Sequence, residues 1–487
     1  MIYLYHTKKN IMRLIDALRT EDGYTQNGMT TNSTTLNSCV DLFFKIGAVR
    51  GKDESIKINS FTKAFAEDAL TAMKILFWVR DIRGGAGERS TFKEIITYLA
   101  THQTKTLSKN LHLIPVYGRW DDLFTLLGTP LEKEALDVIS KGLKESNNLC
   151  AKWMPRGNSK NSKKNFLAKK LREHLNLSQK KYRNLIVGLS NTIEQQMCAK
   201  EFDKINYSHV PSKAMSDYMR AFTKHDTVRF TDYLEQVNSG DVKINAGAIY
   251  PYDVLKSLKS GNVLGANTQW SSLPNYLEGN EEMVLPVVDV SYSMTCSAGG
   301  SPTLNCMDVA ISLGLYISER NEGPFKNGFI TFDNNPRLEY VSGSLSERYK
   351  QMKNANWGGS TNLEITFQVL LDKATKMNVP KEEMPTTILI LSDMEFNRGI
   401  RGGDNPTAQK MIERLYTESG YDTPKIVYWN INASSDNNPV QFNKMNAALV
   451  SGFSPSILTS ILSGEDMSPI NIMYKTINSD RYSQIVI

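Results

Sequence analysis

The stretch "VLPVVDVSYSM", from Val284 to Met294, decides the fold that we expect for the second half of the chain. Its apolar residues predict a buried strand, which ends at Asp289. Hydroxyl side chains follow at alternate positions, Ser291 and Ser293. Carboxylate and hydroxyl oxygens are the ligands that a hard cation such as Mg2+ prefers. The stretch therefore predicts a cation site at the carboxyl end of a buried strand.

Strands and helices alternate in the rest of this half. Apolar runs of strand length recur in "NGFITFD", "TTILILSD" and "KIVYWNIN", with helical patterns between them. This alternation predicts a doubly wound, Rossmann-like α/β domain over residues 281–487. Ligands of such sheets bind beyond the carboxyl ends of the strands. Asp393 ends another predicted strand, and Thr361 lies in the loop "GGSTN" (residues 358–362), so we expect both to lie near Asp289.

Other interpretations compete for Asp289 and its neighbours. A phosphatase of the haloacid-dehalogenase type needs a second Asp where Ser291 stands. A serine hydrolase needs a His base, and none of the six His residues lies in 281–487. A purely structural alternative is that Asp289 and Ser291 cap the following turn. The joint presence of "DVSYS", "GGSTN" and "LSD" favours the cation site over all three.

The first half of the chain differs in pattern and in charge. Apolar residues spaced three and four apart, as in "AEDALTAMKILFWVRDI", predict an all-helical, HEAT-like module over residues 1–240, followed by a connecting segment, 241–280. Residues 281–487 carry 17 Lys and Arg against 23 Asp and Glu, so residues 1–280 carry 40 against 28. A basic half joined to an acidic half predicts a polyanionic partner for the basic half.

A dense basic cluster lies between Lys152 and Arg183, where Glu173 is the only acidic residue. Such a cluster suits contacts with RNA phosphates, and Trp153 and Tyr182 are candidates to stack on bases. A solvated helix surface is the alternative. The segment "SKAMSDYMRAFTKHD" adds a smaller group. The candidate RNA-binding residues are Lys160, Lys163, Lys164, Lys169, Lys170, Arg172, Lys180, Lys181, Arg183, Arg220, Lys224 and His225.

The segment "RDIRGGAGERS", residues 80–90, is rich in glycine but is not a phosphate-binding loop. Such a loop needs Lys and then Ser or Thr after its last glycine, and here Gly87 is followed by Glu88 and Arg89. We expect the segment to end one helix at Gly84 and Gly85 and to begin another. Arg80, Arg83 and Arg89 remain candidates to face a partner.

The motifs of the second half resemble the metal-ion-dependent adhesion site of a von Willebrand factor A domain. The pattern DxSxS…T…D of that site is filled by Asp289, Ser291, Ser293, Thr361 and Asp393. The resemblance covers residues 281–487. It implies a bound Mg2+, or another divalent cation such as Mn2+ or Ca2+. It also implies binding of a protein or ligand instead of catalysis.

Short segments of the first half resemble the helical module of TROVE proteins, and most closely a TROVE-related family of unassigned function. They include "FWVRDIRGGAGERSTF", "LIPVYGRWDDLFTLL" and "VPSKAMSDYMRAFTKHD". The domain order resembles that of Ro-type proteins, in which a von Willebrand A domain closes a HEAT-repeat ring. This resemblance implies a ribonucleoprotein that binds small structured or single-stranded RNA and a protein partner such as an exoribonuclease. The alternative is a metal-dependent interaction or structural component, for example of a virus or phage, without an RNA role.

The composition indicates a protein of a reducing compartment. The chain lacks a run of the ~20 apolar residues that a membrane helix needs, and "MIYLYHTKKN" lacks the order of a signal peptide. The five Cys residues are widely spread and form no CxxC pair, which argues against a disulfide framework and a zinc site. We therefore expect a cytoplasmic protein without a membrane partner.

Overall fold

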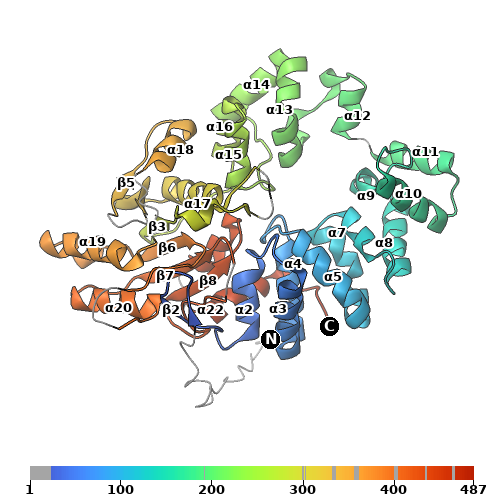
Figure 1. The fold of residues 1–487 in the computed structure, drawn as a ribbon. Helices are drawn as coiled ribbons and strands as arrows, with labels where there is room; N and C mark the ends of the chain where they lie inside the picture. Colours follow the sequence, from blue (N-terminus) through green and yellow to red (C-terminus); the bar gives the residue numbers. More distant parts are fainter. Residues whose placement is uncertain are drawn as a thin grey trace, which may run out of the picture.

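The computed structural model describes residues 23–487 apart from 191, 299–300, 302, 332–335, 356–360, 400–403, 434–435 and 463–466. Helices dominate residues 23–280, and a six-stranded sheet with covering helices forms the rest (Figure 1). The predicted combination of a helical part and an α/β part is therefore confirmed. The helices of the first part are α2 (Ser38–Ile46), α3 (Glu54–Glu67), α4 (Ala69–Arg80), α5 (Ser90–His102), α6 (Thr104–Asn110), α7 (Ile114–Tyr117), α8 (Glu132–Lys144), α9 (Asn148–Trp153), α10 (Ser162–His174), α11 (Gln179–Ser190), α12 (Ile193–Cys198), α13 (Ser212–His225), α14 (Thr227–Ser239), α15 (Pro251–Lys259) and α16 (Val263–Ser271).

The large sheet has the strand order β5-β4-β3-β6-β7-β8, and only the pairing of β4 with β5 is antiparallel. Strands β3 and β6 are adjacent at its centre, with Val288 paired with Leu391. The chain therefore leaves two neighbouring parallel strands at one edge, just before Asp289 and Asp393. The strands are β3 (Val284–Val288), β4 (Gly328–Thr331), β5 (Leu338–Tyr340), β6 (Thr387–Ser392), β7 (Lys425–Asn430) and β8 (Ala447–Ser451).

The helix α17 (Cys306–Arg320) links the sheet to the helical part. It is apolar on nearly every side, and it packs on β3 and on α15. Lys259 of α15 forms an ion pair of 2.6 Å with Asp308 of α17, and Trp270 of α16 donates to Glu319. The predicted connecting segment 241–280 thus holds two helices that dock on the sheet domain. The other helices of that domain are α18 (Leu345–Asn354), α19 (Leu363–Lys376), α20 (Ala408–Glu418), α21 (Leu458–Ile461) and α22 (Pro469–Ile477).

The first described helix, α2, also packs on the sheet domain, against β8. The Ser451 hydroxyl donates to the Phe43 carbonyl and accepts from the Gly47 amide, at 2.8 and 3.1 Å. Gly47 is required at this contact, because a Cβ atom there would lie 2.8 Å from the Ser451 carbonyl oxygen. Both ends of the helical part therefore rest on the sheet domain, and the helices between them curve away from it and return (Figure 1).

A short antiparallel hairpin of strands β1 (Gly23–Tyr24) and β2 (Thr30–Thr31) precedes α2. We call residues 23–31 the N-terminal hairpin. It pairs with loops of the sheet domain through isolated bridges from Gly28 to Asn397 and from Thr30 to Thr407. The first described residues thus belong to the sheet domain in space.

The last residues of the chain cross in the opposite direction, onto the helical part. Arg481 and Tyr482 both donate to the buried carboxylate of Asp81, which follows α4; the Tyr482 bond measures 2.9 Å. The Tyr250 hydroxyl donates to the Ile82 carbonyl in the same loop. The segment 80–90 connects α4 to α5 as predicted, although α4 ends at Arg80, before the glycines. It is also the point at which the C-terminal residues and the segment before α15 meet.

None of the described helices combines the length and the apolar character that crossing a membrane requires.

We expect the Asp81→Asn variant to loosen the C-terminal residues, because it leaves the Arg481 guanidinium without its carboxylate. Arg481 is about one-third exposed, so the loss of unfolding free energy should be about 3 kcal/mol, at the lower end for a broken buried pair. Denaturant unfolding measures this loss, and limited trypsin digestion after Arg481 reports the release of the tail.

Asp480→Asn is the matched control, because Asp480 lies in the same segment with an exposed side chain. It should leave both the unfolding midpoint and the digestion rate near those of the parent. Equal stability of Asp81→Asn and Asp480→Asn would contradict the role of Asp81.

Candidate functional site

The predicted cation site lies where β3 and β6 end side by side. Asp289 is fully buried, and its carboxylate accepts hydrogen bonds from the Ser392 hydroxyl and the Ser291 amide, at 2.5 and 2.8 Å. Asp393 is also buried and accepts from the Glu395 amide at 3.3 Å. Ser392, the middle residue of "LSD", was missed by the sequence analysis, although its place in a strand next to β3 directs it toward Asp289.

Two of the predicted hydroxyl ligands lie in the turn after β3. The Ser291 and Ser293 hydroxyls are 2.9 Å apart, and the Ser293 hydroxyl also forms a hydrogen bond with Asp393. The turn continues as a 3₁₀ helix from Tyr292 to Thr295. The structure thus brings Asp289, Ser291, Ser293 and Asp393 together through direct hydrogen bonds and neighbouring strands.

Thr361, the fifth predicted ligand, precedes α19 and belongs to the same edge. Its hydroxyl donates to the Glu395 carbonyl at 2.8 Å and lies 2.7 Å from the Asn397 side-chain oxygen. Thr361 is therefore held against the loop that follows β6 and Asp393. Gly358, Gly359 and Ser360 of the predicted loop lie outside the described residues.

The N-terminal hairpin reaches this edge, which no sequence signal indicated. The Asn27 amide donates to the Thr361 hydroxyl and to the Glu395 carbonyl, at 3.0 and 2.7 Å. The Gln26 backbone amide donates to the buried carboxylate of Glu395 at 2.6 Å. The hairpin thus fastens the loop that carries Asp393 and contacts a predicted ligand directly.

The two aspartates at this edge hold their protons unusually tightly. Burial raises the pKa of Asp289 although three hydrogen bonds from Ser392 and Ser291 oppose the rise. Burial, and then the neighbouring charge of Asp289, raise the pKa of Asp393 to about 7. Two carboxylates that are buried together repel each other when both are ionised, and a divalent cation between them would remove that repulsion.

The donor set fits a hard divalent cation. Asp289 and Asp393 would supply two charges, and Ser291, Ser293 and Thr361 would supply neutral oxygens, which leaves the ion Lewis-acidic toward a further ligand. Among the described residues, no group of three or more His, Cys, Asp or Glu side chains is arranged to hold a metal. The candidate site therefore depends on hydroxyls as well as carboxylates.

The predicted RNA-binding residues lie on three helices and on the loop before α10. Lys160, on that loop, and Lys163, Lys164 and Lys169 on α10 are exposed, as are Lys180, Lys181 and Arg183 on α11. Lys170 and Arg172 are half-buried, and Lys170 pairs with Glu132 at 3.1 Å. A second exposed group, on α13, consists of Arg220, Lys224 and His225.

Both aromatic residues that the sequence suggested for base stacking have partners inside the protein. Tyr182 is buried, and its hydroxyl donates to the Pro155 carbonyl. The Arg119 guanidinium lies 3.8 Å from the ring centroid of Trp153 and covers one face of it. The exposed aromatic residue of this surface is Phe166 of α10, 53% exposed, with Lys170 5.9 Å from its ring centroid. Its spacing of three from Lys163 and four from Lys170 was the signal that could have identified it.

A cavity of about 970 Å³ lies between α11 and the loop before α10. Arg156, Lys180 and Arg183 line it together with the amides of Asn158, Gln179 and Asn184, and the described residues that line it include no Asp or Glu. A hollow with cations, amides and no carboxylate suits a phosphate backbone.

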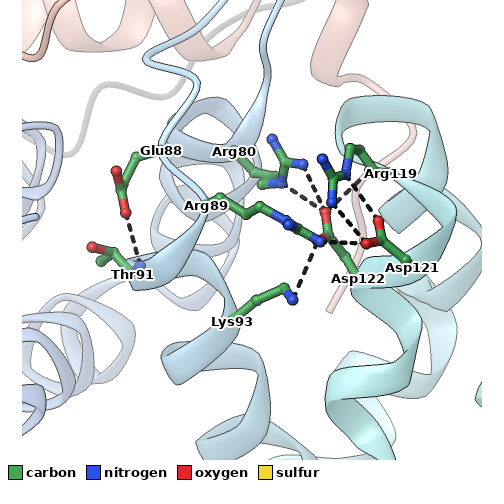
Figure 2. Close-up of polar contacts among 8 residues, drawn as sticks. All are labelled: Arg80, Glu88, Arg89, Thr91, Lys93, Arg119, Asp121 and Asp122. Atoms are coloured by element: carbon green, nitrogen blue, oxygen red, sulfur yellow. Dashed lines mark hydrogen bonds and ion pairs between the residues drawn. The ribbon is translucent and has the colours of Figure 1, made fainter. Parts of the chain in front are cut away.

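Two of the three arginines of the segment 80–90, Arg80 and Arg89, have partners inside the protein (Figure 2). Arg80 and Arg89 both contact the buried Asp122, at 2.7 Å, and Arg89 shares Asp121 with Arg119. Burial raises the pKa of Asp122, but Arg80 and Arg89 more than offset this and hold it below its usual value. Arg80 and Arg89 therefore stabilise the fold, and Arg83 is the exposed member of the set.

Two family models together match nearly the whole described chain. The model of a domain of unknown function, DUF2828, matches residues 25–184 and 132–290, and that of a second domain of unknown function, DUF7788, matches residues 283–483. "Uncharacterized protein L728" of Acanthamoeba polyphaga mimivirus is 30% identical over 503 residues, which cover 92% of this chain and 86% of that protein. The chain belongs to the DUF2828 family, and it is related to this mimivirus protein over most of the length of both.

We expect the Asp393→Asn variant to change the pH dependence of stability. In the unfolded chain an Asp ionises near pH 3.8, but in the folded state Asp393 keeps its proton up to about pH 7. The parent protein without divalent cations should therefore lose stability as pH rises from about 4 to 7. The variant should avoid this loss and be more stable at pH 7.5 by a few kcal/mol, since each pKa unit corresponds to about 1.4 kcal/mol.

Chemical unfolding at pH 4.5 and 7.5, in EDTA and in excess MgCl2, tests this expectation. At pH 7.5 excess MgCl2 should stabilise the parent and should leave the stability of Asp393→Asn unchanged. Lys373→Gln on α19, an exposed change in the same domain, should respond like the parent. A parent that is indifferent to Mg2+ at pH 7.5 would refute the cation site.

Proposed function

We propose that the chain is a non-catalytic RNA-binding protein of the Ro type. In this proposal residues 1–240 are a TROVE-like, HEAT-like module that holds RNA. Residues 281–487 are a von Willebrand A domain whose Mg2+ site recruits a protein partner. The cavity between α11 and the loop before α10 carries the proposal, because it presents Arg156, Lys180 and Arg183 and no carboxylate among its described lining residues.

The exposed lysines extend this cavity into a longer basic surface. Among the described residues, Lys163 and Lys164 at the start of α10 and Lys180 and Arg183 on α11 have no ion-pair partner. Their charges are therefore available to phosphates, whereas Lys169 and Lys170 are partly neutralised by Glu173 and Glu132. Phe166 adds an exposed ring between Lys163 and Lys170, which is the combination that single-stranded RNA binding uses.

The cation site supports partner binding and not turnover. It has two carboxylates and three hydroxyls, and residues 281–487 contain no His that could act as a general base. When bound, the ion would supply an electrophilic centre for a carboxylate or phosphate of a partner. Because Asn27 contacts Thr361 at this edge, such a partner would approach beside the N-terminal hairpin.

A metal-dependent interaction or structural protein without an RNA role is the second candidate. The hydrogen-bonded donor set of Asp289, Ser291, Ser293 and Asp393 favours it independently of the basic surface. The two candidates differ in one observation. The absorbance ratio at 260 and 280 nm of the purified protein reports bound nucleic acid, which only the first candidate requires.

We expect reversal of four charges, Lys163, Lys164, Lys180 and Arg183 to Glu, to weaken binding of single-stranded RNA by roughly two orders of magnitude at low salt. The slope of log K against log salt should become flatter by about 0.7 for each phosphate that the variant no longer neutralises. Sequence preference should change little, because phosphate contacts do not read bases. Fluorescence anisotropy with a labelled oligonucleotide measures both quantities.

Two controls accompany this variant. Reversal of Lys373 and Lys376, exposed on α19 of the acidic domain, should leave the affinity and the salt slope unchanged. Asp289→Asn should also leave RNA binding intact, because the cation site lies in the other domain. If the fourfold variant binds RNA like the parent, the basic surface is only solvated and the second candidate becomes the better account.

Phe166→Ala should weaken the same RNA complex through a different interaction. Stacking of one base on an aromatic ring contributes about 1–3 kcal/mol, so the affinity should fall about 5- to 150-fold while the salt slope stays the same. Tyr340→Ala on β5 is the matched control, since that ring is similarly exposed, at 56%, and lies in the acidic domain. A fall in affinity with a changed slope would instead indicate that the variant disturbs the neighbouring lysines.

A further inference from the structure

Two cysteines face each other beside the turn that follows β3. The Sγ atoms of Cys296 and Cys306 lie 3.5 Å apart, and all five cysteines of the chain are free thiols. Cys296 follows the 3₁₀ helix that begins at Tyr292, and Cys306 is the first residue of α17. This pair belongs neither to the candidate cation ligands nor to the basic surface.

The backbone places the two residues directly opposite each other. The Cys306 amide donates to the Cys296 carbonyl at 3.0 Å, and the next pair inward, Ser297 and Asn305, forms an antiparallel bridge. Opposite residues of this kind have Cα atoms about 5.5 Å apart, within the range that disulfides span. Rotation of the two side chains alone can therefore bring the sulfur atoms into bonding distance, without a change in the backbone.

The two thiols differ in their exposure to solvent and in their hydrogen bonds. Cys296 is partly exposed, its thiol donates to the Cys306 sulfur, and its sulfur accepts a hydrogen bond of 3.3 Å from the Asn432 amide. Cys306, by contrast, is buried.

We propose that Cys296 and Cys306 are a reversible redox pair, in which Cys296 reacts first with a peroxide and Cys306 resolves the product to a disulfide. The partly exposed sulfur accepts from the Asn432 amide, and the buried sulfur is in contact with it. A partly exposed cysteine beside a second, resolving thiol is the arrangement that peroxide-sensing cysteines use.

The chemistry balances with hydrogen peroxide as the only oxidant. The Cys296 thiolate attacks one peroxide oxygen, the O–O bond breaks, and one water leaves once the departing oxygen is protonated. The sulfenic acid that results is attacked by the Cys306 sulfur, which loses its proton as the S–S bond forms and the S–OH bond breaks. A second water leaves, so two electrons pass from the two thiols to one peroxide.

The disulfide would fasten the turn that carries Ser291 and Ser293 to the start of α17. The reduced pair already has the backbone arrangement of the oxidised one, so formation of the bond requires no refolding. The proposal rests on neither the cation site nor RNA binding, and its test measures only the state of the sulfur atoms.

The test treats the full-length protein with hydrogen peroxide at pH 7.5, blocks the remaining thiols and maps the peptides without reduction. We expect a disulfide between Cys296 and Cys306, seen as a loss of two hydrogen atoms relative to the mass of the reduced form. Treatment with dithiothreitol should restore the reduced mass. The Cys306→Ser variant should instead accumulate a sulfenic acid at Cys296 that dimedone traps.

Cys198→Ser is the matched control, because Cys198 is an exposed thiol at the end of α12 with no second cysteine against it. This variant should form the disulfide at the parental rate. Oxidation of Cys198 while Cys296 and Cys306 stay reduced would overturn the proposal. So would oxidation of Cys296 to a sulfinic acid in the parent, since Cys306 would then fail to intercept it.

Discussion

Two adjacent charged residues at the end of α4 hold the molecule together. Arg80 pairs with Asp122 inside the helical part, and Asp81 accepts hydrogen bonds from Arg481 and Tyr482 at the end of the chain. Each of these two side chains is buried, and a buried charge without its partner is very unfavourable. The end of α4 is therefore stable only when the segment after α7 and the C-terminal residues are both in place. These two contacts also fix the position of the loop that follows α4, in which the Ile82 carbonyl accepts a hydrogen bond from the Tyr250 hydroxyl.

The strand order of the sheet explains why the candidate cation ligands lie together at the carboxyl ends of β3 and β6. After β3 the chain moves to one side of the sheet, and it returns to the other side at β6. Asp289 and Asp393 therefore follow neighbouring parallel strands although they are far apart in sequence. The burial that this position imposes raises the pKa of both carboxylates, and the hydroxyls of the turn after β3 are the neutral groups that accompany them.

The sequence predicted the parts of the fold that a local pattern records. The strands β3, β4, β6 and β7 and the positions of Asp289 and Asp393 follow from apolar runs that end in a polar residue. The strand β8 was missed, because "AALVS" carries a weak β pattern and no functional residue. Tyr182 was a candidate to stack on bases but is buried, since an aromatic residue in a basic helix has the same sequence pattern whether it packs inward or outward. Asn27 could not have been found, because its contacts with Thr361 and Glu395 join segments that nothing in the sequence connects.

The N-terminal hairpin has a consequence for how the protein is made. Thr25 donates to the carbonyl of Phe396, 371 residues further along the chain. At a ribosomal rate of 5–20 residues per second, the hairpin leaves the ribosome about 20–70 s before this partner exists. Throughout that interval the hairpin residues that contact the sheet domain, and the face of α2 that meets β8, lack these partners, and contacts of such long range also form slowly. Completion of the sheet domain is therefore a late event of synthesis, and protection of the nascent N-terminal segment by a chaperone would act in this window.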